Sequence, residues 1–186
     1  ENIGKTDSLS VTFNLLAKDE NIWDLYGTRT RVQMQKACPF ELSTFEGYCL
    51  LTSSFFSAYM TNTEHRLLQA ERDKAEDNTI ILHDFFYKNY DLKIKYDPSD
   101  PLKPFVEFDE QIIGSTAEAF GTIYGNGKLM CDQPVAYDSY YNVCQKFVIL
   151  YTTIYVVGKG TVGTYVNILE WISDEEAEQY KKEEGL

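Results

Sequence analysis

The stretch Asp91–Asp97, which reads DLKIKYD, alternates apolar and charged side chains along its whole length. This period of two is typical of a β-strand with one buried and one solvated face. Its leucine, isoleucine and tyrosine therefore point toward a core, and its two lysines point to water. The next segment, 98–104, contains three of the five prolines of the chain. Because proline cannot donate to a strand ladder, this segment predicts a loop that ends the strand.

Outward from this strand, similar β-type patterns fill most of the chain. Segment 65–72 fits either a strand or a helix, and the glycines of 125–127 (GNG) indicate a hairpin because they accept positive φ. The other β-type segments are 29–35, 48–60, 79–90, 105–109, 116–124, 128–136, 140–157 and 164–172. So many antiparallel strands in one domain predict a closed barrel or a two-sheet sandwich, because both protect strand edges.

A helical pattern lies near each end of the chain. Asp19–Tyr26 (DENIWDLY) begins with a capping aspartate, which predicts a short helix. Ser173 and Glu176 predict a capping box for a C-terminal helix, and we expect Ala177 and Tyr180 to dock that helix on the rest of the domain. The sequence thus predicts one domain over 1–186, with an N-terminal segment and helix at 1–27, a barrel at 28–172 and a C-terminal helix at 173–186.

The composition disfavours several classes of protein. The chain has 186 residues, 44% of them hydrophobic, which is enough to bury a core, and its formal net charge is −12. This sign disfavours proteins that track nucleic-acid phosphates and proteins that bind anionic membrane surfaces. The apolar runs are too short to span a bilayer. We therefore predict no nucleic-acid partner and no membrane insertion.

The cysteines predict an oxidising compartment. Cys38, Cys49, Cys131 and Cys144 are even in number and include no CxxC pair, so they lack the close doublets of a zinc site. With only two histidines in the chain, we expect no metal site. We predict two disulfide bonds and a secreted, extracellular protein. Four cysteines allow three pairings, and the sequence does not choose among them.

The motifs that would indicate catalysis or a cofactor are weak. Gly158–Gly163 (GKGTVG) matches a dinucleotide fingerprint, but β-branched and aromatic residues follow where a helix is required, so we predict a hairpin loop. His83 and Asp84 are adjacent, and adjacent strand residues face opposite sides. A calcium site among the acids of 97–110 lacks EF-hand spacing. We expect no cofactor, no metal and no enzymatic activity.

The aromatic content, 15% of the residues, is the feature that points to a function. An eight-stranded barrel is just wide enough to hold one small ligand, and inward positions alternate along each strand. Alternatively, the same rings fill a solid core, and the pattern favours neither. Strand parity also turns Val143 and Ile149 inward. The side chains that we predict to line a cavity are Phe55, Tyr59, Phe85, Tyr87, Leu92, Ile94, Tyr96, Phe108, Phe120, Tyr141, Phe147 and Trp171.

Taken in order, these elements resemble the salivary lipocalins of ticks, the histamine-binding-protein-like family. The matching pieces are Trp23, Cys49, Val135–Ile149 and Tyr165–Trp171. The resemblance implies a mainly β fold, an eight-stranded antiparallel lipocalin-type barrel with a short N-terminal helix and a C-terminal helix. Two family features are absent: the Gly-x-Trp motif, since asparagine stands two positions before Trp23, and a cysteine after the last strand. Japanin-like lipocalins, a sterol-binding and immunomodulatory branch, are the branch that we consider for this chain.

The resemblance implies a secreted protein that sequesters a small hydrophobic ligand, such as a cholesterol-like sterol, a fatty acid or an eicosanoid, and modulates host immunity or inflammation. Histamine or serotonin is the alternative ligand, and such an amine needs a carboxylate inside an aromatic box. Glu107, Asp109 and Glu118 are the candidate acids, but the first two face water if Phe108 faces inward. A further alternative is an effector that uses the barrel as a scaffold and binds a host immune-cell protein through loops such as 97–104.

Overall fold

The computed structural model describes residues 8–13, 30–35, 38–60, 62–101 and 103–185, and it describes side chains within the range from residue 38 onward. The chain divides into two compact units, 1–38 and 39–186. In the first unit, β1 (Ser8–Phe13) and β2 (Thr30–Gln35) form a two-stranded antiparallel sheet. The strand predicted near residues 29–35 is therefore confirmed, although it pairs with β1. The helix predicted at 19–26 lies outside the described residues.

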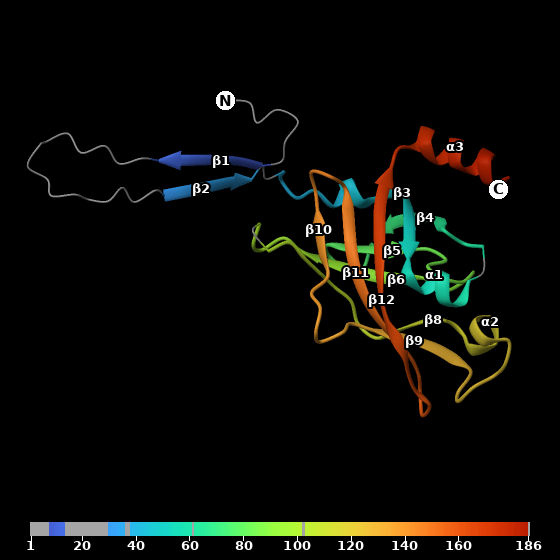
Figure 1. Cartoon of the computed structure of the whole chain (residues 1–186). Coiled ribbons are helices and arrows are strands. Elements are labelled where there is room, and N and C mark those ends of the chain that lie inside the picture. Colours follow the sequence, from blue (N-terminus) through green and yellow to red (C-terminus); the bar gives the residue numbers. More distant parts are fainter. Residues whose placement is uncertain (1–7, 14–29, 36–37, 61, 102, 186) are drawn as a thin grey trace, which may run out of the picture. The chain divides into compact units, whose positions relative to one another are not determined.

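In the second unit, eight antiparallel strands close into a barrel (Figure 1). Each barrel strand pairs with the next one along the chain, and the last pairs with the first, so the barrel is an up-and-down meander. The barrel strands are β3 (Gly47–Ser53), β4 (His65–Arg72), β5 (Thr79–Leu82), β6 (Leu92–Asp97), β7 (Phe105–Glu107), β10 (Tyr140–Asn142), β11 (Phe147–Val156) and β12 (Gly160–Ile172). The predicted antiparallel barrel is confirmed, and its first strand begins at Gly47 rather than near residue 28.

The barrel wall forks between β6 and β11. The additional strands β8 (Gln111–Ser115) and β9 (Lys128–Asp132) are joined by α2 (Thr116–Phe120) and lie between β7 and β10 in the chain. β10 pairs with the first residues of β11, whereas β9 pairs with Thr153–Tyr155. The side chain of Gln111 accepts a hydrogen bond from the Lys93 amide at 2.8 Å and donates one to the Lys93 carbonyl at 2.9 Å. The side-chain amide of Gln111 therefore joins β8 to β6 with one accepted and one donated hydrogen bond, as the backbone of a paired strand residue would.

Four connections of the meander lie at one end of the barrel, which we call the mouth. They are the segment 54–64 with α1 (Ser54–Tyr59), the turn 83–91, the β8–α2–β9 insertion and the hairpin turn 157–159. At the opposite end, which we call the closed end, lies the 3₁₀ helix η1 (Leu42–Phe45), whose Leu42 and Phe45 are buried. The glycine-rich segment 158–163 contains part of the predicted hairpin turn, with positive φ at Gly158 and Gly160, and continues into β12.

The continuous strands predicted at 48–60, 79–90 and 116–124 are wrong at the mouth, because local capping and turn chemistry competes with β propensity there. The Ser53 hydroxyl accepts from the Phe55 amide and begins α1. Ser115 and Glu118 form a capping box that begins α2. After β5, the chain turns with positive φ at Asp84 and Asn89. Aromatic residues that suggested strands thus lie on short helices and turns.

The barrel is filled by its own side chains from the closed end to the mouth. On β6, Leu92 and Ile94 are fully buried and Tyr96 is 1% exposed, which confirms the inward face predicted from DLKIKYD. At the closed end, the Phe45 ring lies 4.6 Å from that of Tyr96 and 5.1 Å from that of Trp171, centroid to centroid. The aromatic residues at the closed end therefore form a solid core rather than the wall of a cavity.

The inward face predicted for β11 is wrong. Tyr141 pairs with Val148, so those two residues share a face, and both are buried. Phe147 is only partly buried, and its ring contacts the exposed Tyr140 at 6.2 Å. The error arose because the prediction carried one parity through 140–157, whereas the chain makes a turn between β10 and β11. Val143 lies in that turn and is partly buried, and Ile149 shares the outward parity of Phe147.

The C-terminal helix α3 (Asp174–Glu184) begins with the predicted capping box of Ser173 and Glu176. Ala177 is fully buried, and the Tyr180 hydroxyl donates to the His65 carbonyl at 3.4 Å. The Lys181 ammonium lies 4.2 Å from the ring centroid of Tyr48 on β3. The helix therefore docks on the barrel wall, as predicted.

The cysteines form one disulfide rather than the two predicted. Cys38 and Cys144 are bonded to each other, whereas Cys49 and Cys131 are buried free thiols. Cys49 pairs with Trp171 on β12, and Cys131 pairs with Ile154, which pairs with Gly163. The two thiols are thus separated along β12 by eight residues, or about 26 Å, and a disulfide needs Cα atoms within about 7 Å.

Candidate ligand site at the barrel mouth

The mouth is covered by aromatic side chains from three of its connections and from strand β12. Phe55 on α1 is fully buried, and around it lie the rings of Phe86 at 4.7 Å, Tyr165 at 5.2 Å and Tyr87 at 6.5 Å. Phe55, the neighbouring residues Phe86 and Tyr87, and Tyr165 come from three separate parts of the chain, so their meeting depends on closure of the barrel. The sequence predicted Phe55 and Tyr87 for a cavity wall, and the structure brings them together here.

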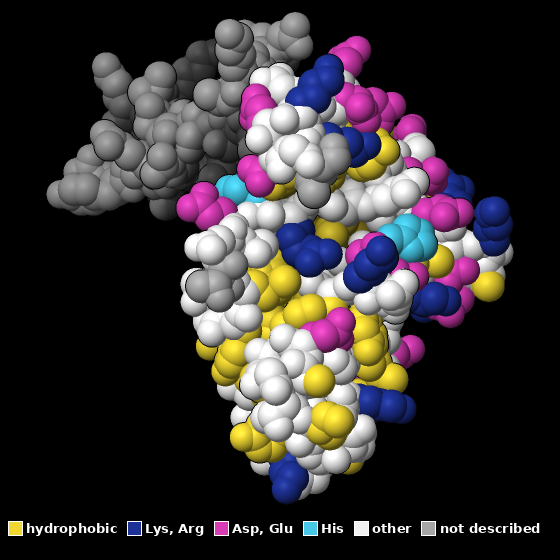
Figure 2. All heavy atoms as spheres, turned by 90° about the vertical axis from the view of Figure 1, so that its right-hand side faces the viewer, with side chains coloured by type: hydrophobic (Ala, Val, Ile, Leu, Met, Phe, Trp, Pro, Cys, Tyr) yellow, Lys and Arg dark blue, Asp and Glu magenta, His cyan; other side chains and the backbone are white. Residues whose placement is uncertain are grey.

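A second layer of this cluster is open to solvent. Tyr59 contacts Phe120 at 5.4 Å and Tyr165 at 6.3 Å, centroid to centroid, and all three side chains are partly exposed. Figure 2, which faces α1 and α2, shows hydrophobic side chains gathered across the middle of this face with isolated charged groups among them. Exposed apolar surface of this kind is typical of an interaction site rather than of a plain barrel end.

The Tyr87 hydroxyl is buried in this cluster and has no hydrogen-bond partner. Burial, and to a lesser extent the nearby charge of Glu118, raises the pKa of Tyr87 to about 12, while Arg66 acts in the opposite direction. A buried hydroxyl without a partner costs free energy. It is therefore a donor that a bound polar group can use.

Arg66 is a site residue that the sequence interpretation missed. It pairs with the buried Leu51 and shares the inner face of β4 with Leu68 and Ala70. The sequence interpretation did not identify Arg66 because segment 65–72 fitted either a strand or a helix. As a strand, the segment places Arg66 on the same inward face as Leu68. A positive charge therefore lies on the inner face at the mouth.

A second polar group at the mouth is fully hydrogen-bonded. Asn167 accepts from the Ser53 hydroxyl at 2.6 Å and donates to the Leu150 carbonyl and the Thr152 hydroxyl. This buried network joins β3, β12 and β11. It fixes the strands beneath α1 and, unlike the Tyr87 hydroxyl, leaves no donor without a partner among its members.

The predicted site residues thus separate into four groups. Phe55, Tyr59, Phe85, Tyr87 and Phe120 lie at the mouth, and Phe85 packs against Phe86 at 4.4 Å. The other seven lie elsewhere: Leu92, Ile94 and Phe108 are buried in or next to the barrel wall, Tyr96, Tyr141 and Trp171 belong to the closed end, and Phe147 is on the outer face.

The acids considered for an amine ligand do not enter the barrel. Glu107 and Asp109 are exposed while Phe108 is 8% exposed, which confirms the parity argument. Glu118 is exposed and engaged with Ser115 in the capping box of α2. Within the described part of the chain, no group of three histidine, cysteine or acidic side chains is placed to hold a metal ion.

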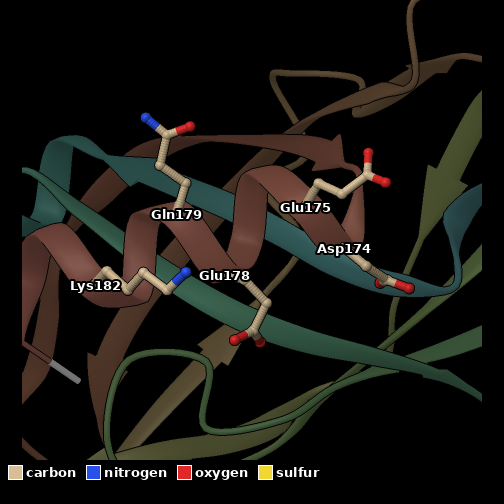
Figure 3. A pocket seen from close by; sticks show the side chains of 5 residues that line it. All are labelled: Asp174, Glu175, Glu178, Gln179 and Lys182. Carbon is tan, nitrogen blue, oxygen red and sulfur yellow. The ribbon is translucent and has the colours of Figure 1, made fainter.

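Two surface depressions lie away from the mouth and carry no comparable chemistry. One lies along α3 and is lined by Asp174, Glu175, Glu178, Gln179 and Lys182. Figure 3 shows these side chains spread along the outside of the helix, and all five are exposed. The other lies at the fork of the wall, where Lys93 is paired with Asp73 and Lys95 with Glu107.

Together, the meander and its aromatic mouth define a closed antiparallel β-barrel that is compatible with a lipocalin-like ligand-binding protein. The family model described as a domain of unknown function, DUF4984, matches residues 25–183, and the chain belongs to that family. No curated protein and no solved structure matches the chain. Among the helices of the described residues, none is both long and apolar enough to cross a bilayer.

Proposed function

We propose that this protein binds a small, mainly apolar molecule at the mouth of the barrel. The observation that carries the proposal is the convergence of partly exposed rings from α1, α2 and β12 in one cluster with Phe55, whose ring also contacts that of Tyr87 with its unpartnered hydroxyl. Removing apolar ligand surface from water there contributes about 25 cal/mol per Å², and a single polar contact would orient the ligand. The ligand lies against the mouth because the side chains beneath it are fully buried, including Leu51, Leu82 and Phe55.

The ligand class is a fatty acid, an eicosanoid or a sterol. A biogenic amine has less support, because the candidate acids Glu107, Asp109 and Glu118 are exposed on the outside and a buried ammonium without a carboxylate is costly. The disulfide of Cys38 supports an oxidising compartment. Secretion, modulation of host immunity, the lack of enzymatic activity and kinship with the tick salivary lipocalins stay predictions.

Native mass spectrometry of the purified protein, followed by displacement of a fluorescent fatty acid, tests the proposal. We expect a bound mass of a few hundred daltons or saturable displacement by lipids, with histamine and serotonin inert. Tyr59→Ala should weaken binding by about 1–3 kcal/mol by removing a ring at the mouth, whereas Phe147→Ala on the outer face should not. Binding of none of these probes, or equal losses in both variants, would contradict the proposal.

A protein-binding role is the second candidate, and one surface favours it. Phe105, Tyr140, Ile149 and Ile168 follow one another across β7, β10, β11 and β12 in register on the outer face. Phe105 is 37% exposed, Tyr140 42% and Ile168 36%. Such a row of exposed apolar side chains is typical of a surface that meets an apolar protein face. If Tyr140→Lys abolishes cell-surface binding while lipid binding persists, this role holds as well.

A further inference from the structure

Arg66 is a partly buried charged residue on the inner face of the mouth. Arg66 and Arg72 share one face of β4, but they lie at opposite ends of the strand. Arg72 is paired with Glu46 at 2.7 Å, whereas no carboxylate of the described residues lies within salt-bridge distance of Arg66. The guanidinium of Arg66 donates instead to the carbonyls of Phe86 at 2.7 Å and Asp84 at 3.0 Å.

These two hydrogen bonds leave most of the guanidinium available. Arginine carries five N–H donors in a planar fork that matches a carboxylate, and the two carbonyls that it meets are neutral. Burial lowers the pKa of Arg66, and the charge of Asp84 offsets part of this effect. A half-buried cation whose burial is only partly compensated gains from a bound anion.

The second donor is the Tyr87 hydroxyl. Tyr87 directly follows Phe86, whose carbonyl accepts the hydrogen bond from Arg66 at 2.7 Å, so Tyr87 adjoins the residue that the guanidinium binds. The Tyr87 hydroxyl has no partner, and the Tyr87 ring is part of the mouth cluster through Phe55. Phe55 also contacts the partly exposed rings of Tyr59 and Tyr165. The guanidinium, the spare hydroxyl and these rings thus belong to one cluster, which is the arrangement that fits an acid group attached to an apolar body.

We propose that Arg66 and Tyr87 bind the carboxylate of an amphipathic acid whose apolar part lies against Tyr59, Phe120 and Tyr165. This inference rests on the proposed function and narrows the ligand from apolar molecules in general to carboxylic acids. Neutral lipids such as a sterol or a fatty alcohol lack the group that Arg66 would hold.

The test compares palmitate with cetyl alcohol, which has the same chain without the carboxylate, on the full protein. We expect palmitate to bind about tenfold to a hundredfold more tightly, the range of a charge-assisted hydrogen bond. Arg66→Gln should remove this preference, and Arg72→Gln, the matched control on the same strand, should keep it. Equal binding of both lipids would overturn the inference and leave the proposed function intact, as would binding of a sterol in the absence of palmitate binding; binding of none of these lipids would overturn both.

Tyr87→Phe separates binding from folding, because Arg66 also holds the turn 83–91. The hydroxyl of Tyr87 makes no hydrogen bond, so its removal should leave the melting temperature unchanged or raise it. The variant should nevertheless lose about three- to tenfold of the preference for palmitate. An unchanged preference in a stably folded Tyr87→Phe protein, together with an unchanged preference in Arg66→Gln, would overturn the inference.

Discussion

The Tyr87 ring packs directly on the backbone of Gly114. A Cβ at Gly114 would lie 2.5 Å from Cδ2 of Tyr87 and 3.0 Å from Cε2. Gly114 is buried in β8, at the irregular register between Ile112 and Gly114. The inserted branch of the wall therefore supports the ring whose hydroxyl we place in the ligand site. This contact links the fork of the barrel to the mouth.

Gly114→Ala should move the Tyr87 ring and destabilise the protein. Overpacking of a filled site costs about 1–3 kcal/mol, measurable in urea unfolding. The double variant with Tyr87→Ala supplies the control, because the added methyl then has space. If Gly114→Ala costs the same with and without the Tyr87 ring, the two residues do not interact and the packing argument is wrong.

At the closed end, removing the hydroxyl from each of two tyrosines should change the free energy of unfolding in different directions. The Tyr96 hydroxyl is buried without a partner, whereas the Tyr141 hydroxyl donates to the Asp97 carbonyl at 3.3 Å. Tyr96→Phe should therefore be neutral or stabilising by about 1 kcal/mol, and Tyr141→Phe should cost about 1 kcal/mol. Equal destabilisation of both variants in denaturant titrations would show that Tyr96 has a partner.

Strand parity and capping were predictable from the sequence wherever a segment made no turn. The alternation in Asp91–Asp97 and the capping box at Ser173 are local patterns, and the structure has both. Parity failed in 140–157, because a turn inside the segment resets which face points inward. The inward face of a short segment without a turn is therefore predicted more reliably than that of a long segment that contains one.

The mouth was only partly predictable, because its helices depend on tertiary packing. Helices α1 and α2 contain aromatic residues, three of them in α1, and such residues favour strands when their burial partners are unknown. Phe55 and Tyr59 were identified as candidates from composition, but their meeting with Phe120 requires the closed barrel. Predicting the position of Arg66 required segment 65–72 to be interpreted as a strand rather than as a helix.

Thiol chemistry should distinguish the two classes of cysteine. Burial raises the pKa of the Cys49 and Cys131 thiols, so neither should react with a thiol reagent in the native protein. After denaturation without reductant, two thiols should titrate, because Cys38 and Cys144 are bonded. Either four reactive thiols or none would contradict the assignment. Loss of the disulfide in Cys144→Ser should cost about 2–4 kcal/mol.

The docking of α3 is tested at Ala177, which is fully buried against the barrel. Ala177→Asp places a charge without a partner at this contact and should cost about 3 kcal/mol or more. Gln179→Asp adds the same charge two residues later at an exposed position, so its melting temperature should stay close to that of the parent. Equal melting temperatures for the two variants would show that the helix does not depend on this contact.

The ion pair of Asp73 and Lys93 should make stability depend on pH at the acid end. The Asp73 side chain is 7% exposed, and its pKa is lowered mainly by the hydrogen bond from Lys93 and also by the Ala75 amide. The pKa of Lys93 is raised, mainly by the same hydrogen bond. A carboxylate with a lowered pKa stabilises the folded state above its ordinary pKa, about 4, and this stabilisation is lost as the pH falls through the folded value.

The raised pKa of Lys93 acts at the opposite end of the pH scale: its contribution is complete below the ordinary lysine pKa and is lost only as the pH rises through the folded value. At neutral pH both contributions are present, so Asp73→Asn should melt below the parent there. The difference should shrink as the pH falls below about 4, because the parent then loses the same charge. Asp77→Asn, in the same turn and exposed, should track the parent throughout. A difference in melting temperature for Asp73→Asn that is constant from neutral to strongly acid pH would show that the carboxylate charge of Asp73 does not stabilise the fold.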